Sequence, residues 1–382
     1  MDDKKKKLIR LTAHSKTLNL LKGQIGYLGQ FMDVILVAKD TGNLKTLAEE
    51  EQVRFRNIEI YREINLIGDL KALWHLIKLF RKEKPDIVHA NTPKGALLGL
   101  LAAKITGVRH RLYNVNGLRF ETATGNFRRL LIFMEKVACA CATKVIPQSN
   151  GVANVVRREH ITKKSLKVIL NGSGNGVDTN YFDPAIPNLT DEAKKIINGF
   201  KGTTFVFVGR LVGDKGINEL VEAFSRLNKK YSDVRLILVG PREEELDPLK
   251  DETIRLIETN DKINEMGRQT DIRPYLMASD VFVLPSYREG FPNVVLEAAS
   301  MGLPCIVSNV NGAEDAIINN VNGYVIPIKD AEALYAHMEY LHIHPTERSI
   351  MANKTRDLIK SRFNRVDVWK ATKEMYDNLW RN

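Results

Sequence analysis

The segment SYREGFPNVVLE, residues 286–297, combines a helix start with groups that bind anions. Pro292 fits the first turn of a helix, because its missing N–H is not needed there. The helix would then present free backbone N–H groups at Asn293 and Val294, and such groups bind anions. This segment therefore predicts a site for a phosphate-bearing ligand.

Two glutamates flank that helix start. Glu289 lies just before it, and Glu297 lies about one turn inside it. Ionised carboxylates accept hydrogen bonds in pairs, which suits two neighbouring hydroxyls such as those of a ribose. The pair indicates a ligand with both phosphates and hydroxyls. The alternative is that the two acids only favour the dipole of their own helix.

Short β-branched runs alternate with longer amphipathic stretches along the whole chain. The runs expected to form strands are residues 8–11, 34–37, 87–89, 111–113, 145–147, 168–170, 204–208, 236–239, 281–284 and 305–307. Apolar residues at three- and four-residue spacing predict helices over 69–81, 92–106, 128–142 and 366–380. Continuous apolar strands separated by helices indicate parallel sheets that are covered on both faces.

Two such sets of strands predict an α/β protein with two doubly wound, Rossmann-like domains. A turn-rich stretch, NGSGNG at 171–176, separates the sets. We place the first domain at 1–182 and the second at 183–365, and we expect the C-terminal helix, within 366–382, to complete the first. Ligands of such sheets bind at the carboxyl ends of the strands, which predicts a site in a cleft between the domains.

Composition excludes several classes of protein. The chain has 382 residues, of which 44% are hydrophobic and 27% charged, which excludes collagen, coiled coil and wholesale disorder. No uncharged apolar run approaches the roughly 18 residues of a membrane-spanning helix, and the N-terminus lacks the apolar core of a signal peptide. Three cysteines (Cys139, Cys141 and Cys305) fit a reducing compartment and are expected to be buried. We therefore expect a cytoplasmic protein.

Positive charge is concentrated in the first half of the chain. Residues 1–182 hold 31 Lys and Arg against 16 Asp and Glu, a net charge of +15, whereas 183–382 have a net charge of −4. A basic half suggests nucleic acid, a phosphate-bearing substrate or an acidic membrane surface as partner, although it is also compatible with a merely solvated surface. Because basic residues are not interleaved with aromatic ones, we expect no nucleic-acid partner.

The Glu-x7-Glu spacing, with Gly-Phe-Pro after the first glutamate, resembles that of family-4 retaining glycosyltransferases of the GT-B fold. The resemblance extends to Val208–Leu211 with Lys215-Gly216, to Gly176–Asp178 with Phe182, and to Ala278–Asp280. In the first half, residues 22–24 (KGQ), 89–94 (HANTPK) and 117–121 (GLRFE) are similar to the branch that builds bacterial capsule and surface polysaccharides.

The resemblance implies roles for residues of the second domain. Arg210 and Lys215 would clamp the nucleotide diphosphate, and Glu289 would face the donor sugar, so that these three form the catalytic set. Glu297 would hold the ribose hydroxyls. The remaining donor-binding residues, expected to act mainly through the backbone, are Gly209, Gly267, Gly290, Phe291, Asn293 and Val294.

The acceptor side is expected in the first domain. Lys22 and Gly23 could approach a diphosphate or merely form a turn. The further candidates, near the ends of predicted strands and turns, are His89, Lys94, Asn116 and Arg119. Many relatives have a histidine where Asn116 stands, which argues against a mechanism that uses a histidine there. The sequence also offers His89 an alternative, purely structural role.

The function implied is transfer of a sugar, with retention, from a nucleotide diphosphate donor, expected to be UDP-linked, to a glycan on a lipid diphosphate. No metal and no other cofactor is expected. The basic first domain would hold the enzyme peripherally on anionic lipid at the cytoplasmic face of the inner membrane. A nucleotide-sugar epimerase of the same fold is the alternative function. Same-face substitution and a covalent intermediate on Glu289 both stay open.

Overall fold

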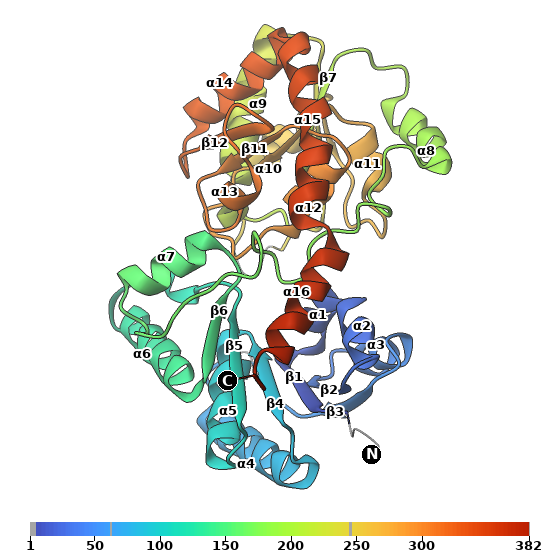
Figure 1. Ribbon diagram of the computed structural model, residues 1–382. Helices are drawn as coiled ribbons and strands as arrows, with labels where there is room; N and C mark the ends of the chain where they lie inside the picture. Colours follow the sequence, from blue (N-terminus) through green and yellow to red (C-terminus); the bar gives the residue numbers. More distant parts are fainter. Residues whose placement is uncertain (1–4, 62, 244–246, 382) are drawn as a thin grey trace. The chain divides into compact units, whose positions relative to one another are not determined.

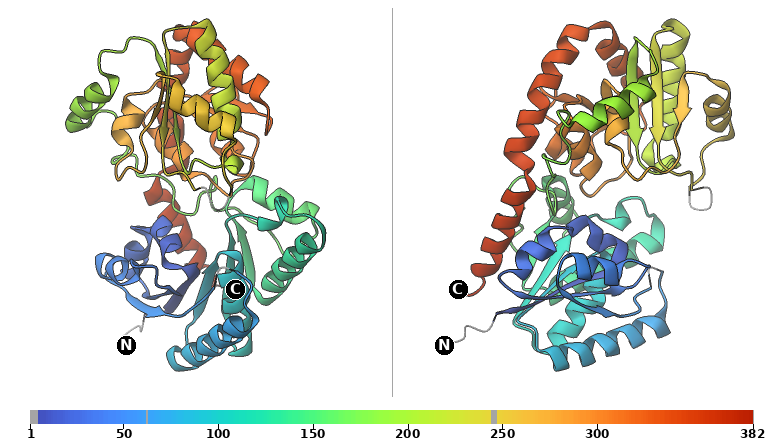
Figure 2. Two further views of the ribbon diagram at one scale, coloured as in Figure 1. Left: turned by 180° about the vertical axis from the view of Figure 1, so that it is seen from behind. Right: turned by 90° about the vertical axis from the view of Figure 1, so that its right-hand side faces the viewer.

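A computed structural model describes residues 5–61, 63–243 and 247–381. The chain forms two compact units, one made of residues 1–175 with 365–382 and the other of residues 176–364. In both units a parallel sheet lies between helices (Figures 1 and 2). This is the α/β class that the alternating pattern predicts.

The first unit contains a six-stranded parallel sheet in the order β3-β2-β1-β4-β5-β6. Its strands are β1 (Lys7–His14), β2 (Asp33–Lys39), β3 (Arg54–Asn57), β4 (Ile87–Asn91), β5 (His110–Val115) and β6 (Lys144–Pro147). Its helices are α1 (Ser15–Leu18), η1 (Asn19–Leu21), α2 (Gln24–Gly29), α3 (Leu44–Glu50), α4 (Leu66–Glu83), α5 (Pro93–Ile105), η2 (Arg119–Glu121), α6 (Gly125–Cys141), α7 (Asn150–Arg158) and α16 (Arg365–Asp377).

The central strand of this sheet is buried on both faces. Leu8 packs into a core shared with α2, α3 and α16, whereas Ile9 and Leu11 pack into the core formed with α4, α5 and α6. Successive side chains of a strand point to opposite faces, so a strand covered on both sides must be apolar throughout. This explains the continuous apolar run in the sequence.

The second unit repeats the plan with the strand order β12-β11-β10-β7-β8-β9. Its strands are β7 (Thr203–Val208), β8 (Val234–Val239), β9 (Ile263–Glu265), β10 (Val281–Leu284), β11 (Cys305–Ser308) and β12 (Gly323–Ile326). Its helices are α8 (Pro187–Ile197), η3 (Gly213–Lys215), α9 (Ile217–Lys230), α10 (Asp251–Thr259), α11 (Arg273–Met277), α12 (Asn293–Ser300), α13 (Ala313–Ala316), α14 (Ala331–Ile343) and α15 (Pro345–Phe363).

The strand predicted at residues 168–170 is wrong. Of that neighbourhood only Leu166 bridges to the edge strand β6, through Val145. Leu170 has a φ of 50°, in the left-handed region that a strand does not use. The chain therefore turns at 168–170, although the β-branched composition of this segment favours an extended conformation. Beside the edge strand β6 the segment has, in the described part of the chain, no strand on its other side with which to pair.

The second unit begins earlier in the chain than the division at which we placed it. The backbone N–H of Val177 donates to the carbonyl of Phe363 at 2.9 Å, and both residues lie in the second unit. The expected division at 182/183 thus falls within that unit. At the other end of the chain, α16 lies in the first unit, where Tyr376 is fully buried.

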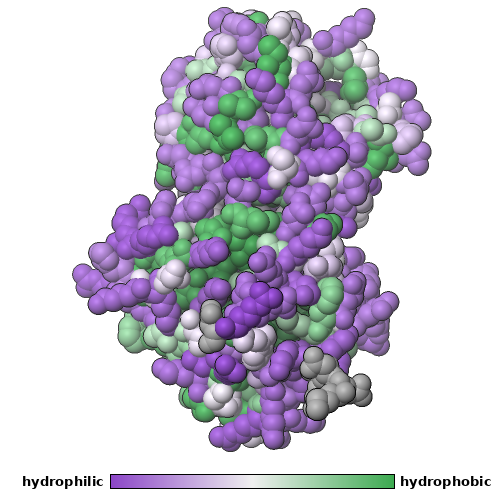
Figure 3. All heavy atoms as spheres, in the orientation of Figure 1, coloured by the Kyte–Doolittle hydropathy of each residue, from purple (hydrophilic) through white to green (hydrophobic). Residues whose placement is uncertain are grey.

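The surface is mostly hydrophilic on the face shown in Figure 3, and the cysteines are buried. The face drawn in Figure 3 is mostly hydrophilic, with hydrophobic areas between. The three cysteines are free and buried, as expected. Within the residues that the structure describes, no helix has both the length and the apolar character needed to cross a bilayer.

Candidate functional site

In the second unit the predicted donor-site residues other than Gly267 follow two neighbouring strands, β7 and β10. Gly209 and Arg210 come directly after β7, and the glutamate segment follows β10. Because the strands are parallel, both loops leave the same edge of the sheet. Lys215 ends η3, which continues the first of these loops.

A glycine allows the two loops to approach each other. Gly216 has a φ of +70°, and a Cβ built there would lie 2.1 Å from the carbonyl oxygen of Pro285. Any other residue would force the loop after β7 away from the loop after β10. The close approach places Lys215, the residue before this glycine, against the start of the glutamate segment.

Lys215 and Glu289 form a direct ion pair. The Nζ of Lys215 lies 2.5 Å from Oε1 of Glu289, and both side chains are largely buried. The hydroxyl of Ser286 donates to the same oxygen at 2.8 Å. Two donors therefore fix the orientation of the Glu289 carboxylate and balance its charge.

The arginines of these loops are also paired with carboxylates. Arg210 Nη1 lies 2.7 Å from Oε2 of Glu243, which lies in the loop after β8. Arg288 Nη2 lies 3.3 Å from Oδ2 of Asp214. These pairs keep both guanidinium groups at the sheet edge, where an anionic ligand could exchange with the carboxylates.

Helix α12 begins at Asn293, and Pro292 is its N-cap in extended conformation, one residue before the first turn in which we placed it. Glu297 lies within this helix. Burial raises the pKa of Glu297 to about 7. A carboxyl with this pKa is poised between its neutral and charged forms at physiological pH, and hydrogen-bond donors from a ligand would favour the charged form.

For the remaining predicted donor-side residues, the structure shows mainly how their backbone packs. A Cβ at Gly312 would lie 2.6 Å from the Cα of Phe291, so the chain at residues 290–291 packs against another loop. The side chain of Phe291 itself is buried in the core. The carbonyl of Gly267, in the turn after β9, accepts from Gly240 N at 2.8 Å, which ties that turn to the end of β8.

In the first unit, Lys22 and Gly23 lie at the start of α2. Lys22 Nζ lies 2.7 Å from Oε2 of Glu50 at the surface. Gly23 has a φ of +84°, and its N–H donates to Oε1 of Glu51 at 2.7 Å. The N–H of Gly26 donates to the other oxygen of Glu51 at 2.6 Å. A carboxylate from the same unit thus occupies this helix N-terminus.

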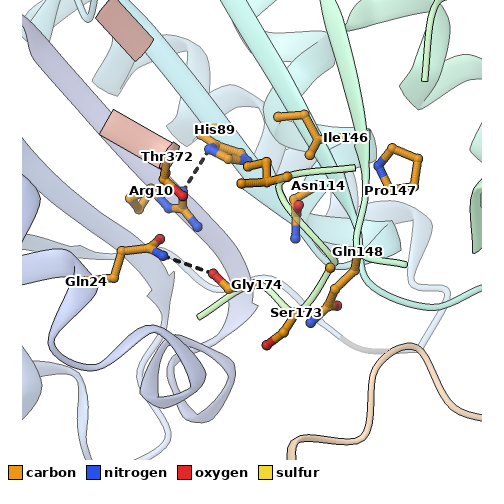
Figure 4. A pocket seen from close by; sticks show the side chains of 12 residues that line it. Arg10, Gln24, His89, Asn114, Ile146, Pro147, Gln148, Ser173, Gly174 and Thr372 are labelled. Atoms are coloured by element: carbon orange, nitrogen blue, oxygen red, sulfur yellow. Dashed lines mark hydrogen bonds between the residues drawn. The ribbon is translucent and has the colours of Figure 1, made fainter. Parts of the chain in front are cut away.

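His89 lies in the middle of β4, so its predicted place at a strand end is wrong. Its Nδ1 lies 2.7 Å from Arg10 Nη1 and 2.6 Å from the hydroxyl of Tyr376 (Figure 4 shows the histidine and arginine on neighbouring strands). Burial, together with the charge of Arg10, lowers the pKa of His89 well below its usual range. The histidine is a neutral member of a buried polar cluster.

Asn116 belongs to an amide network at the end of β5. Its Oδ1 accepts from Asn114 Nδ2 at 2.6 Å and from Asn91 Nδ2 at 3.3 Å. This links the ends of β4 and β5. A side-chain amide that joins two strand ends positions the loops that follow them.

Lys94 and Arg119 lie close together in the first unit. Lys94 is buried, pairs with Asp69 at 2.8 Å and donates to the carbonyl of Glu63. Arg119 Nη2 lies 3.8 Å from Oε2 of the same Glu63. Both cations line one cavity, with a volume of about 320 Å³. Asp69 thus balances the charge of Lys94, whereas Arg119 is paired less closely.

Several functional-site contacts could not be read from the sequence. Glu243, Glu51 and Asp69 each pair with a predicted site residue from another element, and no linear spacing indicates these contacts. Ser286 lies three residues before Glu289, inside the segment already singled out, and its hydroxyl could have been included. Over the described ranges, no group of three or more His, Cys, Asp or Glu side chains could hold a metal ion.

Comparisons with known proteins give the family. Residues 190–358 match the family model of glycosyl transferases group 1, and residues 26–172 match the glycosyl transferase 4-like domain. The chain is 33% identical over 380 residues to the capsular polysaccharide biosynthesis glycosyltransferase CapM of Staphylococcus aureus, covering 98% of each.

A second relative and a solved structure agree. The UDP-Gal:alpha-D-GlcNAc-diphosphoundecaprenol alpha-1,3-galactosyltransferase of Escherichia coli is 33% identical over 356 residues, 91% of this chain and 89% of that protein. The crystal structure of Anabaena Alr3699/HepE in complex with UDP superposes with a TM-score of 0.81 at 19% identity, over 98% of this chain and all of that one. The chain therefore belongs to the group 1 glycosyltransferases with a glycosyl transferase 4-like first half, and it has the GT-B fold.

Proposed function

We propose that this glycosyltransferase moves a sugar, with retention, from a UDP-linked donor to a glycan carried on a lipid diphosphate, in the synthesis of capsule or a related surface polysaccharide. One observation carries the proposal. Arg210, Lys215, the start of α12 and Glu297 all follow neighbouring strands at one sheet edge. That edge offers charge for a diphosphate and a carboxylate for a ribose.

The relatives support the two substrates. The name of the E. coli relative specifies UDP-galactose as donor and a diphosphoundecaprenol-linked acceptor, and HepE was crystallised with UDP. CapM acts in capsular polysaccharide biosynthesis. We propose that this chain uses a donor and an acceptor of the same two classes.

During transfer, negative charge develops on the leaving diphosphate. Arg210 would exchange Glu243 for a phosphate oxygen, and the backbone N–H groups at the start of α12 would face the same charge. Charge-assisted hydrogen bonds of this kind stabilise a leaving diphosphate without a metal ion. We therefore propose that the reaction is metal-independent.

Glu289 would orient the donor sugar. Its carboxylate is held by Lys215 and Ser286, and a carboxylate balanced in this way is a weaker nucleophile than a free one. This arrangement favours same-face substitution over a covalent intermediate. Lys215 would then serve both the carboxylate and the departing diphosphate.

Donor binding is tested by thermal unfolding of the pure protein with UDP, GDP, ADP and CMP. A ligand at 100 times its Kd stabilises a protein by about 2.7 kcal/mol, which is a shift of a few degrees. We expect a shift with UDP that Lys215→Ala and Glu297→Ala both lose. The exposed Lys354→Ala and Glu222→Ala are matched controls. A shift with another nucleotide alone, or release of an epimerised sugar without acceptor, would contradict the proposal.

We also propose peripheral attachment to anionic lipid at the cytoplasmic face of the inner membrane. The first 182 residues have a net charge of +15, and α4 and α6 expose large apolar side chains such as Leu66, Trp74 and Phe133. Charge and exposed apolar surface together favour an anionic bilayer. Sedimentation with phosphatidylglycerol vesicles should show binding that weakens as salt rises. Failure to bind at low ionic strength would exclude it.

A further inference from the structure

A cavity of about 320 Å³ lies within the first unit, at the carboxyl ends of β4 and β5. Its walls are mostly apolar and come from the start of α5, from η2 and from α6, namely Pro93, Phe120, Phe127, Leu131 and Met134. Pockets for small ligands range from about 300 to 1,000 Å³. This cavity has room for a short hydrocarbon segment.

Two cations, Lys94 and Arg119, are among the residues that line the cavity. Arg119 is only loosely paired, at 3.8 Å from Glu63, and its side chain is 44% exposed. Lys94 lines the same cavity, but its pair with Asp69 at 2.8 Å is closer. Arg119 is therefore the group that can turn toward an incoming anion, with Lys94 next to it.

Glu135, which also lines the cavity, is largely neutral at mildly acid pH. Glu135 is buried, and its Oε2 accepts from the hydroxyl of Tyr113 at 2.7 Å. Burial raises the pKa of Glu135 to about 7. A neutral carboxyl that is already hydrogen-bonded is compatible with an apolar ligand.

Exposed apolar side chains lie around this cavity on the two helices that pack against α5. They recur at helical spacing on α4 and α6 and in the turn before α4: Ile64, Leu66, Ile67, Leu70, Trp74, Phe127, Leu130 and Phe133. Ile64 and Phe127 also line the cavity itself. Apolar surface therefore runs from the cavity wall to the outside of the molecule, and patches of this kind mark binding surfaces.

We propose that this cavity binds the first isoprene units of a polyprenyl diphosphate, with its diphosphate at Arg119. The inference rests on the proposed function, since it assigns the lipid part of that acceptor to a site. Hydrocarbon next to a doubly charged group matches an apolar cavity with a cation at its edge, and the rest of the chain continues over the exposed faces of α4 and α6. Neither a free sugar nor a nucleotide has this combination of groups.

The probe is farnesyl diphosphate, compared by calorimetry with inorganic diphosphate and with farnesol, on the full chain without membranes. We expect farnesyl diphosphate to bind at least tenfold more tightly than either. Met134→Asp should lower that affinity at least tenfold and leave inorganic diphosphate unchanged. The matched control is Ile105→Asp, at the other end of α5, where the side chain is exposed. It should bind within twofold of the unchanged protein.

A second wall variant and a second measurement guard against misfolding. Phe127→Ser changes a second, partly exposed wall residue, and UDP stabilisation reports on the second unit in every variant. Equal affinity for farnesyl and inorganic diphosphate would overturn the proposal. So would equal affinity for farnesol, or wild-type binding by both wall variants. If UDP still stabilises the protein but the farnesyl diphosphate results contradict the expectation, only the lipid site is wrong. If UDP has no effect in any protein, the proposed function itself fails.

Discussion

Lys215 and Glu289 are 74 residues apart in the sequence, and their charged atoms lie 2.5 Å apart. The pair joins the loop after β7 to the loop after β10. Its consequence is that the carboxylate and the cation that we propose as catalytic residues are not independent. A change in one alters the charge, position and stability of the other.

Replacing Glu289 with glutamine tests its role. If the carboxylate only orients the sugar, Glu289→Gln should lower kcat by about 10²-fold or less and still transfer sugar, because the amide keeps a hydrogen-bonding oxygen. Turnover is measured by release of UDP in the presence of acceptor. Complete loss of transfer, together with a covalent glycosyl adduct on the unchanged enzyme by mass spectrometry, would show that Glu289 is a nucleophile.

The pKa of Glu297, about 7, predicts how donor binding depends on pH. In the proposed site the ribose hydroxyls would donate to the ionised carboxylate, so UDP affinity should fall as pH falls through 7. If only the ionised form binds, the loss between pH 8 and pH 6 is about tenfold. Calorimetry with uridine, which carries no phosphate to titrate, isolates this effect. A Glu297→Gln variant with the same pH dependence would refute the assignment.

The same carboxyl affects stability in the opposite direction. Its folded-state pKa is raised above the ordinary value of 4.5, so the folded state holds the proton more tightly than the unfolded state. Stability from this group is complete below pH 4.5 and is lost as pH rises through 7. We therefore expect Glu297→Gln to be more stable than the unchanged protein at pH 8 and little different at pH 4. Urea unfolding at both pH values measures this.

Gly216 should tolerate no side chain. Gly216→Ala places a Cβ against the carbonyl of Pro285 at a φ of +70°, and we expect it to cost more than about 1 kcal/mol. The separation of the loops would also weaken UDP stabilisation. Gly199 is the matched control, since it has a φ of +74° with open space around it. Equal loss of stability in both alanine variants would mean that only the backbone angle matters.

Tyr376 should stabilise the first unit through its hydroxyl. That hydroxyl lies 2.7 Å from Arg10 Nη1 and 2.6 Å from His89 Nδ1, and all three side chains are buried. Tyr376→Phe leaves a buried guanidinium short of a partner, at a cost of about 1–3 kcal/mol. Chemical unfolding measures the loss. The exposed Tyr340→Phe should change stability by less than about 0.5 kcal/mol.

The sequence pattern predicted the strands that are buried on both faces. It missed β3, β9 and β12, which have three or four residues and each form an edge of a sheet. Edge strands are covered on fewer sides, so their sequences, such as RFRN in β3, need no apolar run. The error at 168–170 has the same origin, since local composition does not say whether a neighbouring strand is present.

The candidate site shows a similar division. Glu289, Glu297 and the start of α12 are contiguous in sequence, so their relation could be predicted from local rules. The partners Glu243, Glu51 and Asp69 come from separate elements, and only the packing of those elements brings them close. The buried position of His89 likewise depends on Tyr376, 287 residues away.

The position of α16 in the chain determines the order in which the two units can be completed during synthesis. Residues 176–364 are inserted into the first unit, and the buried Tyr376 arrives only after that whole insertion has been made. On the ribosome, the core of the first unit thus stays open until α16 emerges, after the whole second unit has been made. A chain that stops short of α16 would therefore lack part of the core of its first unit, although its second unit would be complete in sequence.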